Sequence, residues 1–478
     1  MTTHGHLPSR QRLHFSGIGG SAMVAGARLA LEMGCEVRGS DNPLYPPASA
    51  MIEELGIPVS QRYAAENLQW QPDAVIIGNA LSRGNPEVEA ALDRRTPYLS
   101  LPEWLKEHIL RFRRPVAICG THGKTTTTAL TAYLLDRAGH EAGYLIGGQP
   151  MDFAHSSRLG AVDAPFVIEG DEYDTAFFDK RAKFFHYIPE VALVTSIEFD
   201  HGDIYRDLAD IERAFRFMLR QVPSSGQLVL CADDPGAMAL APHAFSPVVT
   251  YGFSREANWR GEIIRRGFNP ALRIYRDGVF WGECEAPLAG RHNLQNAIGA
   301  IAVSGALGVT AAQVEESLPR FKGVRRRMEV FLEHEGALFV DDFAHHPTAI
   351  RGVIEAARDR WPGRRLWVAF EPRSNTTVTN RFQTELEEAL SGADHVWIGA
   401  IHRGTNIPPE ERLDREGLVG ALRQRGREAY ATDDVEEIAN HISKHMAPGD
   451  VVLILSNGAF GGLYAMLRER FGAGAKKQ

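Results

Sequence analysis

The stretch that decides the fold is Val116-Ala117-Ile118-Cys119-Gly120-Thr121-His122-Gly123-Lys124-Thr125-Thr126. It opens with four apolar residues of strand character and continues through a turn that contains two glycines. Apolar residues then recur at helical spacing from Ala129 to Leu134. A strand, a glycine turn, a lysine with a threonine, and a helix, in that order, are typical of a phosphate-binding loop. The sequence therefore predicts that a nucleotide binds here.

The polar residues of this loop each match a chemical need of a bound nucleotide. Gly120 and Gly123 let backbone N–H groups approach phosphate oxygens, and the helix N-terminus adds a partial positive charge. Lys124 is expected to neutralise the β- and γ-phosphates, and Thr125 is expected to ligate Mg2+. The longer pattern GxxxxGK(S/T) requires glycine where this chain has Ile118, so the match is partial. The loop residues expected to bind ATP are Gly120, Thr121, His122, Gly123, Lys124, Thr125 and Thr126.

Short apolar strands alternate with helices along the chain, which predicts α/β domains with mostly parallel sheets. We expect a Rossmann-like domain over residues 1–111, a central P-loop ATPase domain over 112–323, and a second Rossmann-like domain over 324–478. Glycines near residues 250–290 separate short alternating runs and favour β-hairpins. The expected strands span residues 13–16, 35–40, 73–78, 116–119, 166–169, 191–195, 227–230, 337–342, 365–370, 395–398 and 450–455, and a helix is expected over 22–33.

The composition restricts the class of protein. The 478 residues carry a formal net charge of -8 without a basic tail, which argues against a general nucleic-acid binder. Arg325-Arg326-Arg327 is either a solvated charge run or a site for a single phosphate or carboxylate. The sequence contains no stretch of about 18 apolar residues and no signal-peptide pattern, so no membrane association is expected.

The four cysteines form no CxxC pair and are expected to be core residues in a reducing compartment. These features together predict a cytoplasmic enzyme that acts on small molecules, as a monomer or a weak dimer. The last residues, 476–478, are expected to fray.

A second glycine-rich turn, Gly17-Ile18-Gly19-Gly20-Ser21-Ala22, follows the first expected strand and fits the pattern G-x-G-x-x-G/A. Asp41 lies near the end of the next strand, where a ribose-binding acid is expected. By itself this pattern fits NAD or FAD as well as any other nucleotide diphosphate. An NAD-dependent oxidoreductase and a P-loop switch NTPase are therefore alternatives of a different class, and tight NAD binding would favour the first. A dehydrogenase needs no P-loop, and a switch needs no second nucleotide-binding domain. Because this chain has both a P-loop and a second glycine-rich nucleotide turn, the sequence favours a ligase.

The loop from Gly120 to Thr126 closely resembles the phosphate-binding loop of the Mur ligases, which build the peptide stem of peptidoglycan. The resemblance extends over all three segments and covers nearly the whole chain. It implies that the three domains bind a UDP-sugar, ATP with Mg2+, and the incoming amine, in chain order. It also implies ATP-dependent formation of an amide bond through an acyl phosphate. The residues that the resemblance assigns to the UDP-sugar are Gly17, Gly19, Gly20, Ser21, Asp41 and Asn79.

Two polar segments follow strands of the central domain. Glu169 ends one buried strand, and Asp200 and His201 follow another. A carboxylate at a strand end beside a P-loop is well placed to hold Mg2+, although an acidic turn is the alternative. The resemblance assigns Glu169 and His201 to a second Mg2+ that bridges the γ-phosphate and the acceptor carboxylate. The expected metal ligands are therefore Thr125, Glu169 and His201.

An amide pair opens a later helix of the central domain. Asn293 and Asn296 are three residues apart, so both amides point the same way from the helix start. Amides pair with both the donor and the acceptor edges of a base, and the resemblance assigns this element to adenine. N-capping by Asn293 is the alternative. Both residues are expected to bind ATP.

Two motifs at the start of the third domain also resemble the family. There, Arg326 and Arg327 would reach over the phosphates, with Arg327 expected to bind ATP. Asp342 would contact the ribose of ATP, and His346 the reacting centre. A metal site made of Asp342, His345 and His346 is the alternative, but ligands so close along an extended chain cannot all converge. The residues expected to be catalytic are Lys124, Glu169, His201 and His346.

Residues of the third domain indicate which amine substrate is expected. Members of the family that use UDP-N-acetylmuramate add either L-alanine or, in peptidoglycan recycling, the tripeptide L-alanyl-γ-D-glutamyl-meso-diaminopimelate. This chain resembles the second group in its acidic motif over residues 169–174 and at Ala349, which replaces a glutamate of the family pattern. A longer, carboxylate-bearing peptide is the expected substrate, with L-alanine as the alternative. The residues expected to bind the peptide are Arg373, Asn375, Ser456 and Asn457.

Overall fold

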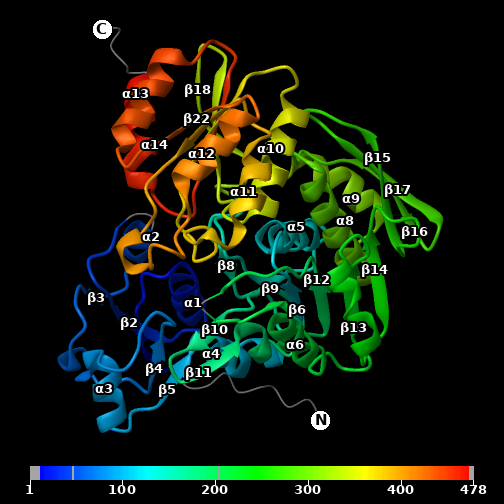
Figure 1. Ribbon diagram of the computed structural model, residues 1–478. Helices are drawn as coiled ribbons and strands as arrows, with labels where there is room; N and C mark the ends of the chain where they lie inside the picture. Colours follow the sequence, from blue (N-terminus) through cyan, green and yellow to red (C-terminus); the bar gives the residue numbers. More distant parts are fainter. Residues whose placement is uncertain (1–10, 46–47, 203, 473–478) are drawn as a thin grey trace.

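The computed structural model describes residues 11–45, 48–202 and 204–472, which form three α/β units around a common centre (Figure 1). The units contain sheets of five, ten and six strands, and a separate two-stranded sheet belongs to the central unit. The expected fold class is confirmed. We propose that the domains span residues 1–111, 112–323 and 324–478, because each range contains one main sheet with its helices. The tail at 476–478 lies outside the described residues.

The first unit has a fully parallel sheet in the order β3-β2-β1-β4-β5, which is the Rossmann-like order. Its strands are β1 Arg12–Ser16, β2 Glu36–Ser40, β3 Val59–Ser60, β4 Ala74–Ile77 and β5 Tyr98–Ser100. Its helices are α1 Ser21–Glu32, α2 Ala48–Glu54, α3 Pro86–Asp93 and α4 Leu101–His108, with the short 3-10 helices η1 Ala65–Leu68 and η2 Leu110–Phe112. On one face Leu13, Phe15 and Val37 pack in the same core as the apolar side of α1 and the α4 residue Trp104.

The other face of this sheet contains a buried polar network centred on Glu87. The Glu87 carboxylate is fully buried and accepts hydrogen bonds from Ser16 Oγ at 2.6 Å, Ser40 Oγ at 2.5 Å and Asn67 Nδ2 at 2.6 Å. His14 Nε2 lies 3.4 Å from the same carboxylate. Burial alone would raise the pKa of Glu87, but hydrogen bonds from His14, Ser16, Ser40 and Asn67 lower it to about 2. The network therefore holds an ionised carboxylate inside the first unit.

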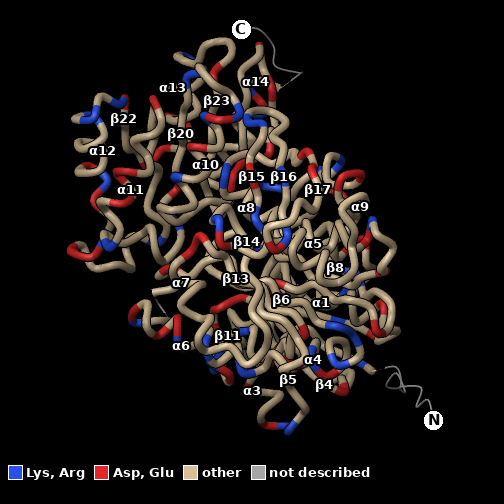
Figure 2. The backbone as a smooth tube through the Cα atoms, turned by 90° about the vertical axis from the view of Figure 1, so that its right-hand side faces the viewer, with Lys and Arg blue, Asp and Glu red and all other residues tan. Residues whose placement is uncertain are grey.

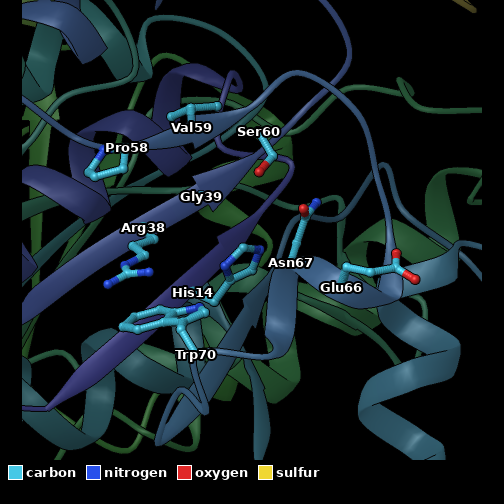
Figure 3. A pocket seen from close by; sticks show the side chains of 9 residues that line it. All are labelled: His14, Arg38, Gly39, Pro58, Val59, Ser60, Glu66, Asn67 and Trp70. Atoms are coloured by element: carbon cyan, nitrogen blue, oxygen red, sulfur yellow. The ribbon is translucent and has the colours of Figure 1, made fainter.

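A pocket of about 340 Å³ adjoins this network (Figure 3). His14 and Trp70 line it, and the guanidinium of Arg38 stands 4.4 Å above the Trp70 ring. The buried Nδ1 atom of His14 has no hydrogen-bond partner among the described residues. His14 therefore belongs both to the Glu87 network and to the wall of the pocket.

The central unit is built on one ten-stranded sheet in the order β17-β16-β15-β14-β13-β12-β6-β9-β7-β8. Its strands are β6 Arg114–Cys119, β7 Gly143–Leu145, β8 Ser157–Arg158, β9 Pro165–Gly170, β12 Val191–Val194, β13 Gln227–Cys231, β14 Val248–Gly252, β15 Trp259–Arg265, β16 Ala271–Arg276 and β17 Val279–Glu285. The strands β10 Asp174–Ala176 and β11 Asp179–Ala182 form the two-stranded sheet. The expected hairpins are confirmed, because β16 pairs antiparallel with both β15 and β17.

Helices α5 and α8 pack together over this sheet, where α5 contacts β6 and β9 while α8 contacts β12 to β15. In Figure 1 the cyan helix α5 lies directly below the yellow helices of the third unit. The helices of the central unit are α5 Lys124–Arg137, α6 Leu208–Leu219, α7 Pro235–Met238, α8 Arg291–Ala306 and α9 Ala311–Ser317, with the 3-10 helices η3 Lys183–His186, η4 Ala241–His243 and η5 Leu318–Arg320.

The third unit has a six-stranded sheet in the order β18-β19-β23-β20-β21-β22, parallel except for β18. Its strands are β18 Glu329–His334, β19 Ala337–Asp342, β20 Leu366–Phe370, β21 His395–Ile398, β22 Glu428–Ala431 and β23 Val451–Leu455. Its helices are α10 Pro347–Arg360, α11 Gln383–Leu390, α12 Arg415–Gln424, α13 Val435–His445 and α14 Leu463–Phe471, with η6 Asn380–Phe382, η7 Gly404–Asn406 and η8 Phe460–Gly462. Two apolar clusters cover its two faces.

Parallel pairing brings the loops that contain the expected site residues to shared sheet edges. In the central unit, Cys119 at the end of β6 pairs with Val194 of β12 and Gly170 of β9. In the third unit, Leu455 at the end of β23 pairs with Asp342 of β19 and Phe370 of β20. The loops that follow these strand ends therefore emerge side by side, where open α/β sheets bind ligands.

Charged residues of both signs are spread along the backbone in all three units (Figure 2). Within residues 11–45, 48–202 and 204–472, the helices all lack the length or the apolar content that crossing a bilayer requires.

The Glu87 network generates a prediction about stability. Replacing Glu87 with Ala removes the shared acceptor of two serine hydroxyls and an amide, and is expected to lower the free energy of unfolding by about 3 kcal/mol at neutral pH. The folded pKa of about 2 lies below the ordinary value of 4.5, so this contribution is present above pH 4.5 and is lost as the pH falls toward 2. Denaturant unfolding of wild type and E87A at several pH values measures it.

The matched control is Asp93→Asn, which changes an exposed acid at the end of the same helix α3. A destabilisation by E87A that stays the same between neutral pH and about pH 3 would contradict the charge network.

Candidate active site

The phosphate-binding loop connects β6 to α5 in a conformation that only glycine adopts easily. Gly120 has φ +120° and Gly123 has φ +81°. A Cβ atom at Gly120 would collide with the Thr195 side chain, and one at Gly123 with Asn296. The first intrahelical hydrogen bond of α5 runs from Thr127 N to Gly123 O. The N–H groups of the first helical turn therefore remain available to an anion.

Lys124, the first residue of α5, is held by an internal carboxylate. Its Nζ donates to Glu172 Oε2 at 2.8 Å and to Gly120 O at 2.6 Å. His201 Nε2 lies 3.5 Å from the other oxygen of Glu172. Burial alone would lower the pKa of Lys124, but the charges of Glu172 and Asp171 outweigh it and raise the pKa. Lys124 is therefore a fixed cation where the phosphate-binding loop joins α5.

Glu169 and Thr125 face each other beside this lysine. Thr125 Oγ1 donates to Glu169 Oε2 at 3.2 Å, and the Gly147 N–H donates to Glu169 Oε1 at 2.6 Å. Burial and the nearby Asp171 raise the pKa of Glu169. Arg327 Nη2 reaches across from the start of the third unit to Thr125 Oγ1 at 3.2 Å. A threonine hydroxyl and a glutamate carboxylate thus point into one space next to a lysine and an arginine.

His346 joins the third unit to the P-loop. It is the N-cap of α10, and its Nε2 donates to Phe199 O at 3.3 Å. Its ring lies 4.7 Å from that of His122, between centroids. Glu198 accepts hydrogen bonds from His122 Nε2 at 3.1 Å and from Thr348 Oγ1 at 2.8 Å. Burial and the neighbouring His122 lower the pKa of His346 to about 4, so this imidazole is neutral at pH 7.

The remaining residues expected to bind ATP are engaged within the protein. Asn293 Nδ2 donates to Ala289 O at 2.9 Å, and Asn296 Nδ2 donates to Asn293 Oδ1 at 3.3 Å. The two amides therefore lie together, with Asn296 against the P-loop. Asp342 accepts from the N–H groups of Met328 and Ala344, both at 2.8 Å, and burial raises its pKa to about 6. Asp342 thus fixes the backbone just before β18 and just after β19.

The glycine turn of the first unit is closed by Asp41. The Gly19 N–H donates to Asp41 Oδ2 at 2.7 Å, and Tyr63 Oη donates to Asp41 Oδ1 at 2.7 Å. Gly17 has φ +81°, Gly20 is the N-cap of α1, and Ser21 is its first residue. Asn79 is exposed after β4, at the same sheet edge. These six expected residues therefore surround one helix N-terminus.

Two loops of the third unit converge after β20 and β23. Arg373 Nη1 donates to His402 Nδ1 at 3.1 Å and lies 3.5 Å from Glu371 Oε1. Ser456 Oγ donates to the other oxygen of Glu371. The buried Oδ1 atom of Asn457 lacks a hydrogen-bond partner among the described residues. Arg373 and Ser456 thus contact the same carboxylate, that of Glu371, and Asn457 follows Ser456 directly in the chain.

Asn375 is exposed on the loop that follows Arg373. The expected peptide residues therefore all belong to these two loops, which lie next to each other because β20 and β23 are paired.

Three family models match successive parts of the chain: the Mur ligase family catalytic domain at residues 12–113, the Mur ligase middle domain at 118–304, and the Mur ligase glutamate ligase domain at 326–458. A protein of Escherichia coli (strain K12), the UDP-N-acetylmuramate–L-alanyl-gamma-D-glutamyl-meso-2,6-diaminoheptandioate ligase, is 39% identical over 458 residues, which are 95% of this chain and 97% of that protein. The chain belongs to the Mur ligase family. The expectation drawn from the P-loop is confirmed, and this Mur ligase is an enzyme of the ligase class.

This Mur ligase is also similar to an alanine-adding relative and to a solved structure. A UDP-N-acetylmuramate–L-alanine ligase of Methylibium petroleiphilum (strain ATCC BAA-1232 / LMG 22953 / PM1) is 35% identical, with coverage of 97% of this chain and 99% of that protein. The crystal structure of a murein peptide ligase from Psychrobacter arcticus 273-4 has a TM-score of 0.73 at 35% identity, and covers 97% of this chain and 99% of that one.

Four residues to which the sequence assigned no role lie near the P-loop in the structure: Glu172, Glu198, Asp200 and Thr376. Thr376 Oγ1 of the third unit donates to Asp200 Oδ1, and Glu198 and Glu172 hold His122 and Lys124. Glu172 stood inside the acidic motif after β9, and Glu198 and Asp200 precede His201. Their strand-end position was the available signal, but only the tertiary structure shows which cation each one meets.

Lys124 generates the prediction of this site. Lys124→Ala removes the fixed cation and leaves Glu172 unpaired, so ATP-dependent phosphate release is expected to fall by about 100-fold or more. The matched control is Lys180→Ala, which removes an exposed lysine of β11 that pairs with Asp174. A phosphate-release assay measures both variants, with thermal unfolding to verify that they fold. Activity of K124A close to that of the K180A control would contradict a role for Lys124 at the phosphates.

Proposed function

We propose that this Mur ligase joins UDP-N-acetylmuramate to the tripeptide L-alanyl-γ-D-glutamyl-meso-diaminopimelate, with hydrolysis of ATP to ADP and phosphate. The observation that carries the proposal is the full-length similarity to the Escherichia coli ligase of that name, at 39% identity. The murein peptide ligase from Psychrobacter arcticus supports it independently at the level of structure. The L-alanine ligases, at 35% identity, make L-alanine the second candidate amine.

The first step is phosphoryl transfer. The lactyl carboxylate attacks the γ-phosphorus of ATP, an O–P bond forms, and ADP leaves with the electrons of the broken bond. Negative charge builds up around the γ-phosphate when the carboxylate attacks it, so nearby cations and N–H donors lower the activation barrier of this step. Lys124, Arg327 and the first turn of α5 supply these groups beside Thr125.

The residues around Thr125 fit a magnesium ion. Thr125 Oγ1 and Glu169 Oε2 are oxygen donors 3.2 Å apart, which is the kind of ligand that Mg2+ prefers. We propose that Thr125 ligates one Mg2+ and that Glu169 and His201 hold a second Mg2+. In the structure His201 Nε2 lies 3.5 Å from Glu172 Oε1. Bound Mg2+ would offset the charge of the phosphates during transfer.

The second step is acyl transfer to the amine. The amine nitrogen attacks the carbonyl carbon of the acyl phosphate, the N–C bond forms, phosphate leaves, and the nitrogen loses a proton. Water would hydrolyse the same intermediate, so the site has to close around it. The contacts of His346 with Phe199 and of Thr376 with Asp200 hold the third unit over the P-loop and support such a closed arrangement.

The first and third units would bind the UDP-sugar and the peptide. We propose that UDP lies on the N-terminus of α1, where Gly19, Gly20 and Asp41 surround the helix end. The peptide carboxylates would meet Arg373, which lies at the surface shared by the loops after β20 and β23. We further propose a cytoplasmic location, supported by four cysteines that are all free and mostly buried.

The choice of amine has a direct test. Purified enzyme with ATP and UDP-N-acetylmuramate is expected to release phosphate when the tripeptide is added, and to remain near background with L-alanine alone. Phosphate release and mass analysis of the product measure this. Turnover with L-alanine and none with the tripeptide would overturn the recycling assignment in favour of an alanine ligase.

Arg373 provides a second test. Arg373→Ala is expected to raise KM for the tripeptide by about 10-fold or more, because a charge-assisted hydrogen bond to a carboxylate is lost, while KM for ATP stays unchanged. Arg403→Ala, an exposed arginine of the neighbouring loop, is the matched control. Steady-state kinetics with each substrate varied in turn separates the two constants. An unchanged KM for the tripeptide in R373A would remove Arg373 from the peptide site.

A further inference from the structure

Three side chains from two units converge beside the P-loop. His122 comes from the loop between β6 and α5, Glu198 follows β12, and His346 is the N-cap of α10. One ligand atom from each lies within 4.8 Å of the other two. His122 Nε2 is 3.1 Å and His346 Nδ1 is 3.5 Å from the same oxygen, Glu198 Oε2. None of these three residues is among the expected Mg2+ ligands.

The distances suit a transition-metal ion of zinc size. Zinc bonds to imidazole nitrogen and carboxylate oxygen are about 2.0–2.1 Å long, so neighbouring ligands of a tetrahedron lie about 3.3 Å apart. The distances from Glu198 Oε2 to the two histidine nitrogens, 3.1 and 3.5 Å, bracket that value. Two imidazoles with one carboxylate favour Zn2+ and its neighbours in the first transition row over Mg2+, which prefers oxygen ligands.

The protonation of His346 is set for metal binding. Its Nε2 faces the carbonyl oxygen of Phe199 at 3.3 Å, and a carbonyl only accepts, so Nε2 has the proton. Its Nδ1 therefore has the lone pair, which accepts from the Thr348 N–H at 3.3 Å and points toward Glu198. A backbone carbonyl that orients a ligating histidine in this way is the usual outer-shell arrangement of zinc sites. An ion bound to all three side chains would replace two hydrogen bonds, from the Thr348 N–H to His346 Nδ1 and from His122 Nε2 to Glu198 Oε2.

A second group with metal-like spacing, Glu103, Asp179 and His186, differs in one respect. The guanidinium of Arg181 donates to both oxygens of Asp179, at 2.9 and 2.7 Å, and so already supplies the cation there. This group serves as an internal control.

We propose that His122, Glu198 and His346 form a metal site separate from the expected Mg2+ ligands. The site is selective for Zn2+ or a similar transition-metal ion, and the bound ion holds the third unit against the P-loop. A water molecule would complete four-coordination. Because the ligands come from two units, ion binding and the closed arrangement of these units stabilise each other.

The test uses full-length enzyme titrated with Co2+ or Zn2+ in the presence of excess Mg2+, which occupies the oxygen ligands around Thr125 and Glu169. Co2+ in four-coordinate geometry gives strong visible absorption, and Zn2+ is followed by calorimetry. Wild type is expected to bind one ion per chain at this site and to gain thermal stability from it. His122→Ala and Glu198→Gln are each expected to weaken binding by more than about 100-fold, since outer-shell changes alone cost about 10- to 100-fold.

His346→Ala is expected to do the same, which shows that the ion bridges two units. The controls are His186→Ala, from the second group, and His243→Ala, an exposed histidine of the central unit. Both are expected to bind the ion with wild-type affinity. E198Q preserves the shape of the side chain, and thermal unfolding without metal verifies that each variant is folded. Absence of Co2+ and Zn2+ binding under excess Mg2+, or unchanged affinity in H122A and E198Q, would overturn the proposal.

Discussion

The site depends on the in-register parallel pairing of β6 with β9 on one side and β12 on the other. Cys119, Gly170 and Val194 end these strands at one level, so the segments that follow them meet at one edge. This pairing brings Lys124 to Glu172, Thr125 to Glu169, and His122 to Glu198. A slip of one residue in any of the three strands would turn its side chains to the opposite face and separate these pairs.

The third unit contributes through the same constraint. Its strands β19, β20 and β23 end in register, so the loops with His346, Arg373 and Ser456 emerge together. Contacts from His346 and Thr376 then reach Phe199 and Asp200 of the central unit. The candidate active site therefore lies where the edges of two sheets meet.

Much of this arrangement could be predicted from the sequence, for a physical reason. Buried parallel strands are continuous apolar runs, and the glycines at Gly120 and Gly123 are needed where the chain adopts positive φ. These signals are local, so the main strands and both glycine turns were predicted within one or two residues. The approach of Asn296 to Gly123 of the P-loop, the Glu87 network and the partners of Glu198 depend on residues far apart in the chain. No pattern within one segment shows such contacts.

The ion pair of Lys124 and Glu172 has a consequence for the reaction cycle. The lysine has an anionic partner within the protein, the Glu172 carboxylate, at 2.8 Å. An arriving nucleotide therefore exchanges one anion for another, and it gains less binding energy than it would from a bare buried cation. The same exchange runs backward when ADP departs. The Glu172 carboxylate thus spares the P-loop an unpaired buried cation whenever a phosphate leaves Lys124.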